Sequence, residues 1–447
     1  MKDKLVSMAP FFVILGIVLV WGFLQGWFSP ATGPEPAESA PPAVAGTAET
    51  TETPETAAAS PGTPSTREAG AGGDSTQSTP PEGAAATWST YHGDANLAGV
   101  AAAILPDTPA RLWRFQTNAP ILYGPVASEK LLHFTTSQGE VVAVDFTGKK
   151  SWSKQLTRTS INDNAEQPAR VDGPVSCFDS TVLLGTMAGV VYALDAATGD
   201  EKWRRDIGSA ILGAVTYLPA SDTRPNARVY VIGQDDGALH CLAFDDGAPI
   251  WTSEPIDRCD GSPAAGENII TFGSCASALH VVNATDGTIL QNVTVGDDSQ
   301  IAGGVAVRGN AVFTGSHSGH VFQADIAEGK VVWTNEGTGA EVFTTPAVGA
   351  DRVVYGSMDD FVYCLDRASG QEIWKWDSSG LPTSPVIAGD KVVVGSDGVL
   401  YMLSLASGDV LWRFEVSDEI SSPSIINNMI VVGGKDGSLS AFGAAGA

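Results

Sequence analysis

Short apolar runs of strand length alternate with glycine-containing polar turns from about residue 111 to the end of the chain. In the clearest copy, the apolar run Val190–Asp195 lies between turns at Gly189 and Gly199 and is followed by Trp203. A turn glycine with tryptophan four residues later recurs at Gly148/Trp152, Gly199/Trp203, Gly247/Trp251, Gly329/Trp333, Gly370/Trp374 and Gly408/Trp412, whereas Gly287 is followed by Gln291. A period of about 40 to 50 residues with this order of strands and turns is typical of radial or solenoid repeats.

Each repeat divides into four short strands, the first of which opens on small residues and often proline, as at Gly173 and Pro174. Counting these first strands gives eight repeats. The eighth ends without a fourth strand, whereas Arg111–Phe115 is a fourth strand that precedes the first repeat. We therefore predict an all-β fold: an eight-bladed β-propeller of four-stranded antiparallel blades, closed by the segment around Trp113.

The N-terminal part of the chain has a different pattern. Residues 9–28 form an uncharged, mostly apolar run of the length that a bilayer-spanning helix needs. Lys2 and Lys4 precede it, and this bias keeps residues 1–8 in the cytoplasm and sends the rest across the membrane. The alternative is a cleaved signal peptide, since Ser29–Ala31 loosely resembles a cleavage site.

Residues 29–87 are rich in proline, alanine, threonine and glutamate and are predicted to be a disordered linker, because they cannot bury enough apolar surface. The predicted domains are thus a short cytoplasmic N-terminus (1–8), a transmembrane anchor preceding the propeller (9–28), the linker (29–87) and the propeller (88–447). The expected location is single-pass in the inner (cytoplasmic) membrane, with the propeller in the periplasm or outside.

The formal charge is −26, from 51 acidic and 25 basic residues. Such a surface repels phosphate groups, which argues against nucleic acid as a partner. The tryptophans occupy one fixed place per repeat, where a large indole buries area between neighbouring sheets. We predict a structural role, with ligand stacking as the alternative, for Trp113, Trp152, Trp203, Trp251, Trp333, Trp374 and Trp412.

Two runs, Val191–Trp203 and Val362–Trp374, resemble the tryptophan-docking repeat of pyrroloquinoline-quinone (PQQ)-type propellers, and Trp88–Gly99 looks like the segment that precedes the first blade there. The resemblance covers residues 88–447 and implies the fold but not the chemistry, because that family includes quinoprotein dehydrogenases and non-catalytic members. The dehydrogenases characteristically carry adjacent cysteines and a calcium site. This chain has no adjacent cysteine pair, and BamB-like outer-membrane assembly propellers are therefore nearest in character.

Five cysteines occur, and two of them flank the hairpin between the first two strands of the fourth repeat. Cys259 and Cys275 are equidistant from a turn centred near Glu267, so we expect a disulfide between them in an oxidising compartment. Two separate thiols are the alternative, since a slip of one residue would point the side chains apart.

The lengths of the predicted loops distinguish one face of the propeller from the other. The connection from Trp152 to Pro174 is longer than its counterparts and would lie over one mouth of the channel, where acidic residues also collect. An acidic mouth attracts a cation or a basic peptide, and a merely solvated surface is the alternative. The candidate binding rim comprises Asn162, Asp163, Asn164, Glu166, Asp257, Asp260, Asp297 and Asp298. A second insertion, Pro219–Ala227, lengthens a hairpin on the opposite face.

No motif of a hydrolase, a nucleotide-binding loop or a metalloprotease occurs. We therefore expect no catalytic residue, no cofactor and no metal ligand, and interpret the chain as a membrane-anchored, monomeric scaffold that binds unidentified protein partners in the cell envelope. The BamB-like resemblance implies a role in outer-membrane protein assembly. The alternatives are a dehydrogenase-like quinoprotein dependent on PQQ and calcium, and an extracytoplasmic sensor domain.

Overall fold

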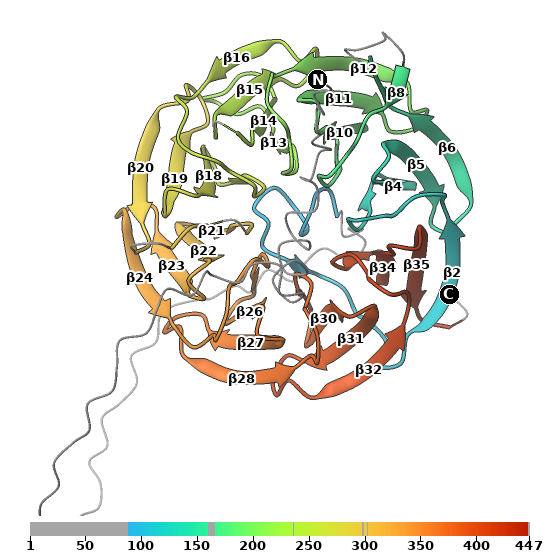
Figure 1. Ribbon diagram of the computed structural model, residues 1–447, viewed down its shortest axis with the longest axis vertical. Helices are drawn as coiled ribbons and strands as arrows, with labels where there is room; N and C mark the ends of the chain where they lie inside the picture. The colour runs from blue at the N-terminus through green and yellow to red at the C-terminus, as the bar shows by residue number, and fades with distance from the viewer. Residues whose placement is uncertain (1–87, 160–165, 236, 297–298, 302, 446–447) are drawn as a thin grey trace, which may run out of the picture. The chain divides into compact units, whose positions relative to one another are not determined.

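The apolar runs pair into eight radial blades of four strands, one of which gains a fifth strand from the segment before the first blade (Figure 1). The computed structural model describes residues 88–159, 166–235, 237–296, 299–301 and 303–445. The predicted N-terminus, anchor and linker (1–8, 9–28 and 29–87) lie outside the described residues. Within the described part every element is a strand, and the predicted eight-bladed propeller of four-stranded antiparallel blades is confirmed.

Each blade has strands A to D from the channel outward. The A strands are β3 (Val126–Ala127), β9 (Ser176–Phe178), β13 (Thr216–Leu218), β17 (Ala264–Ala265), β21 (Ala306–Arg308), β25 (Ala347–Val348), β29 (Val386–Ala388) and β33 (Ser424–Ile426). The B strands are β4 (Leu131–Thr135), β10 (Thr181–Gly185), β14 (Arg228–Ile232), β18 (Ile269–Ser274), β22 (Ala311–Gly315), β26 (Arg352–Gly356), β30 (Lys391–Ser396) and β34 (Met429–Gly433).

The C strands are β5 (Glu140–Asp145), β11 (Val190–Asp195), β15 (Leu239–Ala243), β19 (Ala278–Asn283), β23 (Val321–Asp325), β27 (Phe361–Asp366), β31 (Val399–Ser404) and β35 (Ser438–Gly443). The D strands are β6 (Lys150–Gln155), β12 (Glu201–Asp206), β16 (Pro249–Thr252), β20 (Ile289–Thr294), β24 (Lys330–Asn335), β28 (Glu372–Asp377), β32 (Val410–Glu415) and β2 (Ala110–Gln116). Three further strands are β1 (Val100–Ala101), parallel to β29, and the hairpin β7 (Thr157–Thr159) and β8 (Glu166–Pro168).

The ring closes by pairing the two ends of the repeat region. β2 lies antiparallel to β35, with Trp113 opposite Ala441, and so supplies the fourth strand that the last blade lacks. The prediction that the segment around Trp113 closes the ring is confirmed. Closure removes the free sheet faces that an open array would expose to water.

Neighbouring blades are joined by indole hydrogen bonds at a fixed place. The Nε1–H of a D-strand tryptophan donates to a backbone carbonyl just after strand C of the next blade, at 2.8–3.1 Å. The pairs are Trp113–Phe146, Trp152–Ala196, Trp203–Phe244, Trp251–Thr285, Trp333–Arg367 and Trp374–Leu405. Trp412 packs its ring edge-on against Phe442 of β35, with centroids 5.7 Å apart.

The turn glycine of the repeat receives the indole of the preceding blade. Gly408 has a φ of +76°, and a Cβ added there would lie 2.7 Å from the ring of Trp374. A Cβ added at Gly370 would likewise meet the ring of Trp333. A side chain at either glycine would therefore clash with the indole as well as strain the backbone. The glycine and tryptophan of one motif thus serve two different seams between blades.

Replacing Trp374 by alanine removes a side chain that is only 8% exposed, together with its hydrogen bond to the Leu405 carbonyl. We expect Trp374→Ala to lower the free energy of unfolding by about 3–5 kcal/mol. The matched control is Gln291→Ala, at the equivalent place in blade four, for which we expect a loss below about 2 kcal/mol. Chemical denaturation measures both. Equal losses would contradict a special role of the indole.

One buried histidine links stability to pH. The side chain of His133 on β4 has no exposed surface, its Nε2 lies 2.9 Å from Ser128 Oγ, and burial lowers its pKa to about 4. Because the unfolded chain binds this proton near pH 6.5, acid favours unfolding. The stabilisation is fully present above about pH 6.5 and is lost as the pH falls toward 4.

We expect His133 to contribute a loss of about 2 kcal/mol of unfolding free energy between pH 7 and pH 5. His133→Gln keeps a polar atom near Ser128 but cannot be protonated in this range, so its stability should fall less on acidification. Urea unfolding of both proteins at pH 7 and pH 5 tests this. The same pH dependence in both would show that His133 is not responsible.

Candidate functional site

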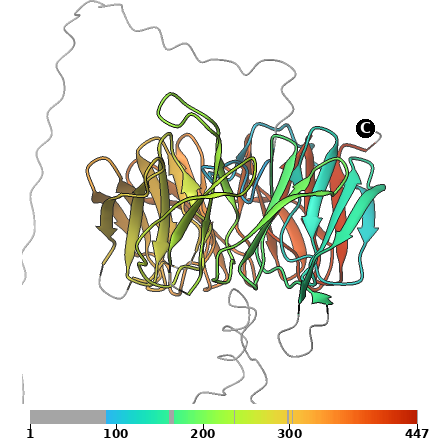
Figure 2. The same ribbon diagram turned by 90° about the horizontal axis from the view of Figure 1, so that it is seen from above.

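One mouth of the channel is covered by the described segment that precedes the first blade. Residues 88–104, here called the crossing segment, pass over the centre of the ring on one face (Figures 1 and 2). Its backbone carbonyls accept hydrogen bonds of 2.6–2.8 Å from A-strand N–H groups of six blades. The donors are Ala127, Cys177, Ala265, Val307, Val348 and Ile387. These bonds satisfy inward-facing donors that would otherwise need water in the channel.

Side chains of the crossing segment are held in a buried polar network. The Tyr91 hydroxyl lies 2.8 Å from Ser384 Oγ and 3.1 Å from Thr345 Oγ1. The two ring nitrogens of His92 each lie 2.8 Å from a carbonyl oxygen, those of Leu97 and Pro385. Burial lowers the pKa of His92, although both carbonyls raise it. A buried imidazole that lies between two backbone carbonyls is a structural element rather than an exposed acid or base.

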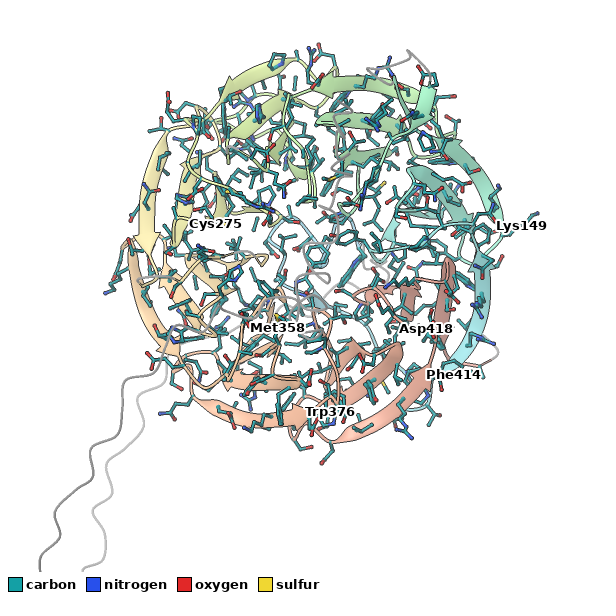
Figure 3. The ribbon with its side chains drawn as sticks, in the orientation of Figure 1. Lys149, Cys275, Met358, Trp376, Phe414 and Asp418 are labelled. Carbon is teal, nitrogen blue, oxygen red and sulfur yellow. The ribbon has the colours of Figure 1, made fainter. Side chains whose placement is uncertain are left out.

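The opposite face, here called the rim face, carries the B–C turns and D–A loops, because the strands of each blade alternate in direction. The two sets of loops are joined by backbone bonds, for example from Met358 N–H to Glu341 O at 2.9 Å and from Cys275 N–H to Arg258 O at 3.0 Å. Figure 3 shows Met358 and Cys275 on the channel side of their blades, whereas Lys149 and Trp376 lie at the outer edge.

Carboxylates outnumber bases on the rim face, and three of its bases are paired with carboxylates. Arg258 Nε contacts Asp260 at 3.1 Å, Lys435 contacts Glu419 at 2.5 Å, and Arg170 Nε lies 2.7 Å from Asp172. The pKa of Asp172 is raised, because the effect of its burial is larger than the opposite effect of the neighbouring Arg170.

Exposed carboxylates remain at Asp257, Asp360, Asp377, Asp397 and Asp418. Burial, followed by the charges of Asp397, Asp359 and Asp377, raises the pKa of Asp360. The carboxylates of blades six and seven therefore lie close enough to repel one another.

The residues of the predicted binding rim fall into three groups. Asp257 is exposed, and its Oδ1 accepts the Arg258 N–H at 2.7 Å. Asp260 is half-buried and accepts a hydrogen bond from Gln234 Nε2 at 2.7 Å. Its negative charge is balanced by the ion pair with Arg258. Glu166 is exposed at the start of β8. Asn162, Asp163, Asn164, Asp297 and Asp298 lie outside the described residues. Of the described members, Asp257 and Asp260 lie together in one D–A loop around Arg258, whereas Glu166 lies in the loop between blades one and two.

The predicted disulfide between Cys259 and Cys275 is not formed, since all five cysteines are thiols. The hairpin pairs Ala264 with Thr271 and Ala265 with Ile270. Farther from the turn, the Cys275 N–H donates to the Arg258 carbonyl at 3.0 Å, so Cys275 lies opposite Arg258 rather than Cys259. The turn centre is displaced by half a residue from the expected one, and this is the one-residue slip that separates two side chains. Cys259 is instead buried, with its Sγ 3.2 Å from the Asp257 carbonyl.

Two open grooves lie on the face of the crossing segment. The larger, of about 1110 Å³, follows the seam between blades four and five. A second, of about 860 Å³, lies at the closing seam beside Trp113. The sequence prediction did not find the larger groove, although two signals pointed to it: the glutamine at position 291 and the insertion Pro219–Ala227. Among the described residues no cluster of three or more histidine, cysteine, aspartate or glutamate side chains could hold a metal ion.

Comparison with known proteins shows which family this propeller resembles. Residues 163–376 and 359–446 match the family model described as outer membrane protein assembly factor BamB. The BamB of Xanthomonas campestris is 23% identical over 295 residues, covering 55% of this chain and 71% of that protein. The BamB of Escherichia coli is 22% identical over 343 residues, covering 64% and 86%.

Solved structures share the fold. The crystal structure of BamB from Moraxella catarrhalis superposes with a TM-score of 0.59 at 22% identity, covering 75% of this chain and 99% of that chain. The quinohemoprotein alcohol dehydrogenase from Comamonas testosteroni superposes with a TM-score of 0.64 at 13% identity, covering 80% of each. At these identities the likeness extends to the fold alone.

These comparisons correct the expected location. The prediction of a single-pass inner-membrane protein is wrong, because the relatives are named for assembly at the outer membrane. No helix among the described residues is long and apolar enough to cross a membrane. The prediction rested on residues 9–28, which lie outside that part of the chain; the length of an apolar run does not specify the membrane to which a protein is finally delivered.

The matched region runs from blade two to the end of blade eight, well over half of the chain, and agrees with the repeat, the indole contacts and the closed ring described above. The chain therefore belongs to the BamB family of PQQ-like repeat propellers.

Proposed function

We propose that this propeller is a non-catalytic scaffold that binds protein partners during the assembly of outer membrane proteins. The observation that carries the proposal is the match of residues 163–446 to the family described as outer membrane protein assembly factor BamB. The likeness to a quinohemoprotein alcohol dehydrogenase, at 13% identity, gives no support to quinone chemistry in this chain.

The arrangement of the channel supports a binding role. The crossing segment occupies one mouth with hydrogen bonds to six blades, so the rim face is the one whose loops surround a mouth that no described segment crosses. Loops held in fixed positions by rigid blades provide a preformed surface for a partner. We infer that the rim face, including Asp257, Asp260 and the segment around Glu166, is the principal partner-binding surface.

The charge of the rim face suggests the character of the partner. Arg170, Arg258 and Lys435 are already paired with carboxylates, whereas Asp257 and Asp418 are exposed. A surface with excess negative charge accelerates association with a basic surface, and salt weakens this effect. The partner should therefore present lysine or arginine to the rim.

A photo-crosslinking experiment in cells tests the proposed function. A crosslinking amino acid placed at Met358 or Asp418 on the rim face should capture components of the machinery that assembles outer membrane proteins. Lys149, at the outer edge of blade one (Figure 3), is the control position and should capture much less. Equal capture from Lys149 would contradict the rim assignment. PQQ- and calcium-dependent alcohol oxidation by the purified protein would contradict a non-catalytic role.

Charge reversal measures the electrostatic contribution separately. We expect the double variant Asp257→Lys, Asp418→Lys to slow association with the captured partner about tenfold at low salt and to flatten its salt dependence. Asp246→Lys changes an exposed carboxylate in a C–D turn on the other face. It should leave the association rate and its salt dependence unchanged. Stopped-flow or surface-binding kinetics at two salt concentrations provide the measurement. An unaltered association rate in the double variant would show that these carboxylates do not steer the partner.

A further inference from the structure

The seam between blades four and five is built differently from its neighbours. At the place of the D-strand indole, blade four carries Gln291 on β20, and its Nε2 donates to the Ala327 carbonyl at 3.3 Å. The six indole bonds at other seams are shorter, at 2.8–3.1 Å. The carbonyl acceptor and the turn glycine, Gly329, are both retained on blade five. Only the large aromatic group is missing.

The groove of about 1110 Å³ follows this seam. Leu290 and Gln291 of β20 line its outer end together with Ala327, and Asn96 of the crossing segment lines its inner end. Val281, Val307 and Ile326 are buried and form an apolar floor. Leu290 is 50% exposed beside them. A glutamine has less volume than an indole, and the groove is large enough for several residues of an extended peptide.

The insertion Pro219–Ala227 provides one wall of the groove and is fixed in place. It rises between β13 and β14 on the face of the crossing segment (Figure 2). Arg224, only 2% exposed, donates from its guanidinium to the Pro219 carbonyl at 2.9 and 3.1 Å and to Asn268 Oδ1 of blade four at 3.1 Å. This arginine fastens the insertion to the next blade, so that Ser221, Asp222 and Thr223 face the groove. The missing indole and the added wall therefore occur at the same groove.

The charge of the groove has one sign. Asp222 and Glu267 are both exposed, and the residues that line the groove include no lysine, arginine or histidine. An apolar floor under two carboxylates complements a large apolar or aromatic side chain next to a positive charge.

We propose that this groove binds an extended segment of a partner protein in which an aromatic side chain adjoins lysine or arginine. The aromatic ring packs against Leu290, beside the Gln291 amide that takes the place of the larger indole over Gly329, and the basic side chain faces Asp222 and Glu267. The inference rests on the proposed function only in taking the occupant to be a protein. It adds a second binding surface, on the face opposite the rim, and specifies its chemistry.

A direct binding experiment with purified full-length chain in mild detergent tests the groove. The probe is a fluorescein-labelled ten-residue peptide with one tryptophan between two lysines, followed by fluorescence anisotropy. We expect saturable binding that weakens at least tenfold when alanine replaces the tryptophan of the peptide or glutamate replaces its lysines. Binding that is insensitive to either replacement, or no saturable binding, would overturn the proposal.

Variants of the protein locate the site. Gln291→Trp restores the indole of the other seams, so it should raise the thermal unfolding midpoint and weaken peptide binding at least tenfold. Leu290→Ala should weaken binding several-fold. Leu411→Ala is its matched control, since Leu411 is 44% exposed at the equivalent place on β32. Unchanged affinity in Gln291→Trp, or equal losses in the two leucine variants, would place the peptide elsewhere.

A charge variant covers the case in which Gln291→Trp does not fold. Asp222→Lys combined with Glu267→Lys alters two exposed side chains and should weaken binding of the basic peptide at least tenfold, and retained affinity would overturn the proposal. The result is independent of the assembly role. If the unaltered protein shows no saturable peptide binding while the rim crosslinks are intact, the groove alone is refuted. If the peptide binds but the rim crosslinks are absent, only the proposed function is refuted.

Discussion

The contact between an indole and the turn glycine of the next blade is the interaction on which this structure depends. A single blade cannot bury its apolar faces and is stable only against neighbours. An indole buries area at every seam except that between blades four and five, and its N–H requires an acceptor, for example a carbonyl just after strand C of the following blade. Because the hydrogen bond has one geometry and the glycine admits one approach, neighbouring blades are fixed in rotation as well as in distance.

A ring fixed in this way leaves variation to the loops. The crossing segment covers one mouth by pairing with the A strands, and the opposite mouth is surrounded by carboxylates whose neighbouring bases are already neutralised. The same framework occurs in a quinohemoprotein dehydrogenase at 13% identity, so the architecture does not determine the chemistry. What a member of this fold binds depends on the groups that its loops and seams expose.

Local sequence patterns predicted the propeller well, because each strand and turn depends on residues close together in the chain. The missing fourth strand of the last repeat and the spare strand around Trp113 together predicted the closure. The Cys259–Cys275 disulfide failed for a reason of register, since half a residue at the turn centre changes which side chains face each other. The pairing of Asp260 with Arg258 and Gln234 was also missed, and it reduces the charge of a predicted binding residue.

The number of blades, the order of their strands and the departure at Gln291 follow from the repeats along the chain and could be predicted from the amino-acid sequence. Two features became known from the folded arrangement of the blades. A turn glycine receives the tryptophan of the preceding blade, with Gln291 in its place at Gly329, and Arg224 fastens an insertion of blade three beside the seam of blades four and five. These contacts join residues from different blades. Their positions depend on how the blades are rotated around the ring, and that rotation is set by the packing of whole sheets rather than by any local run of residues.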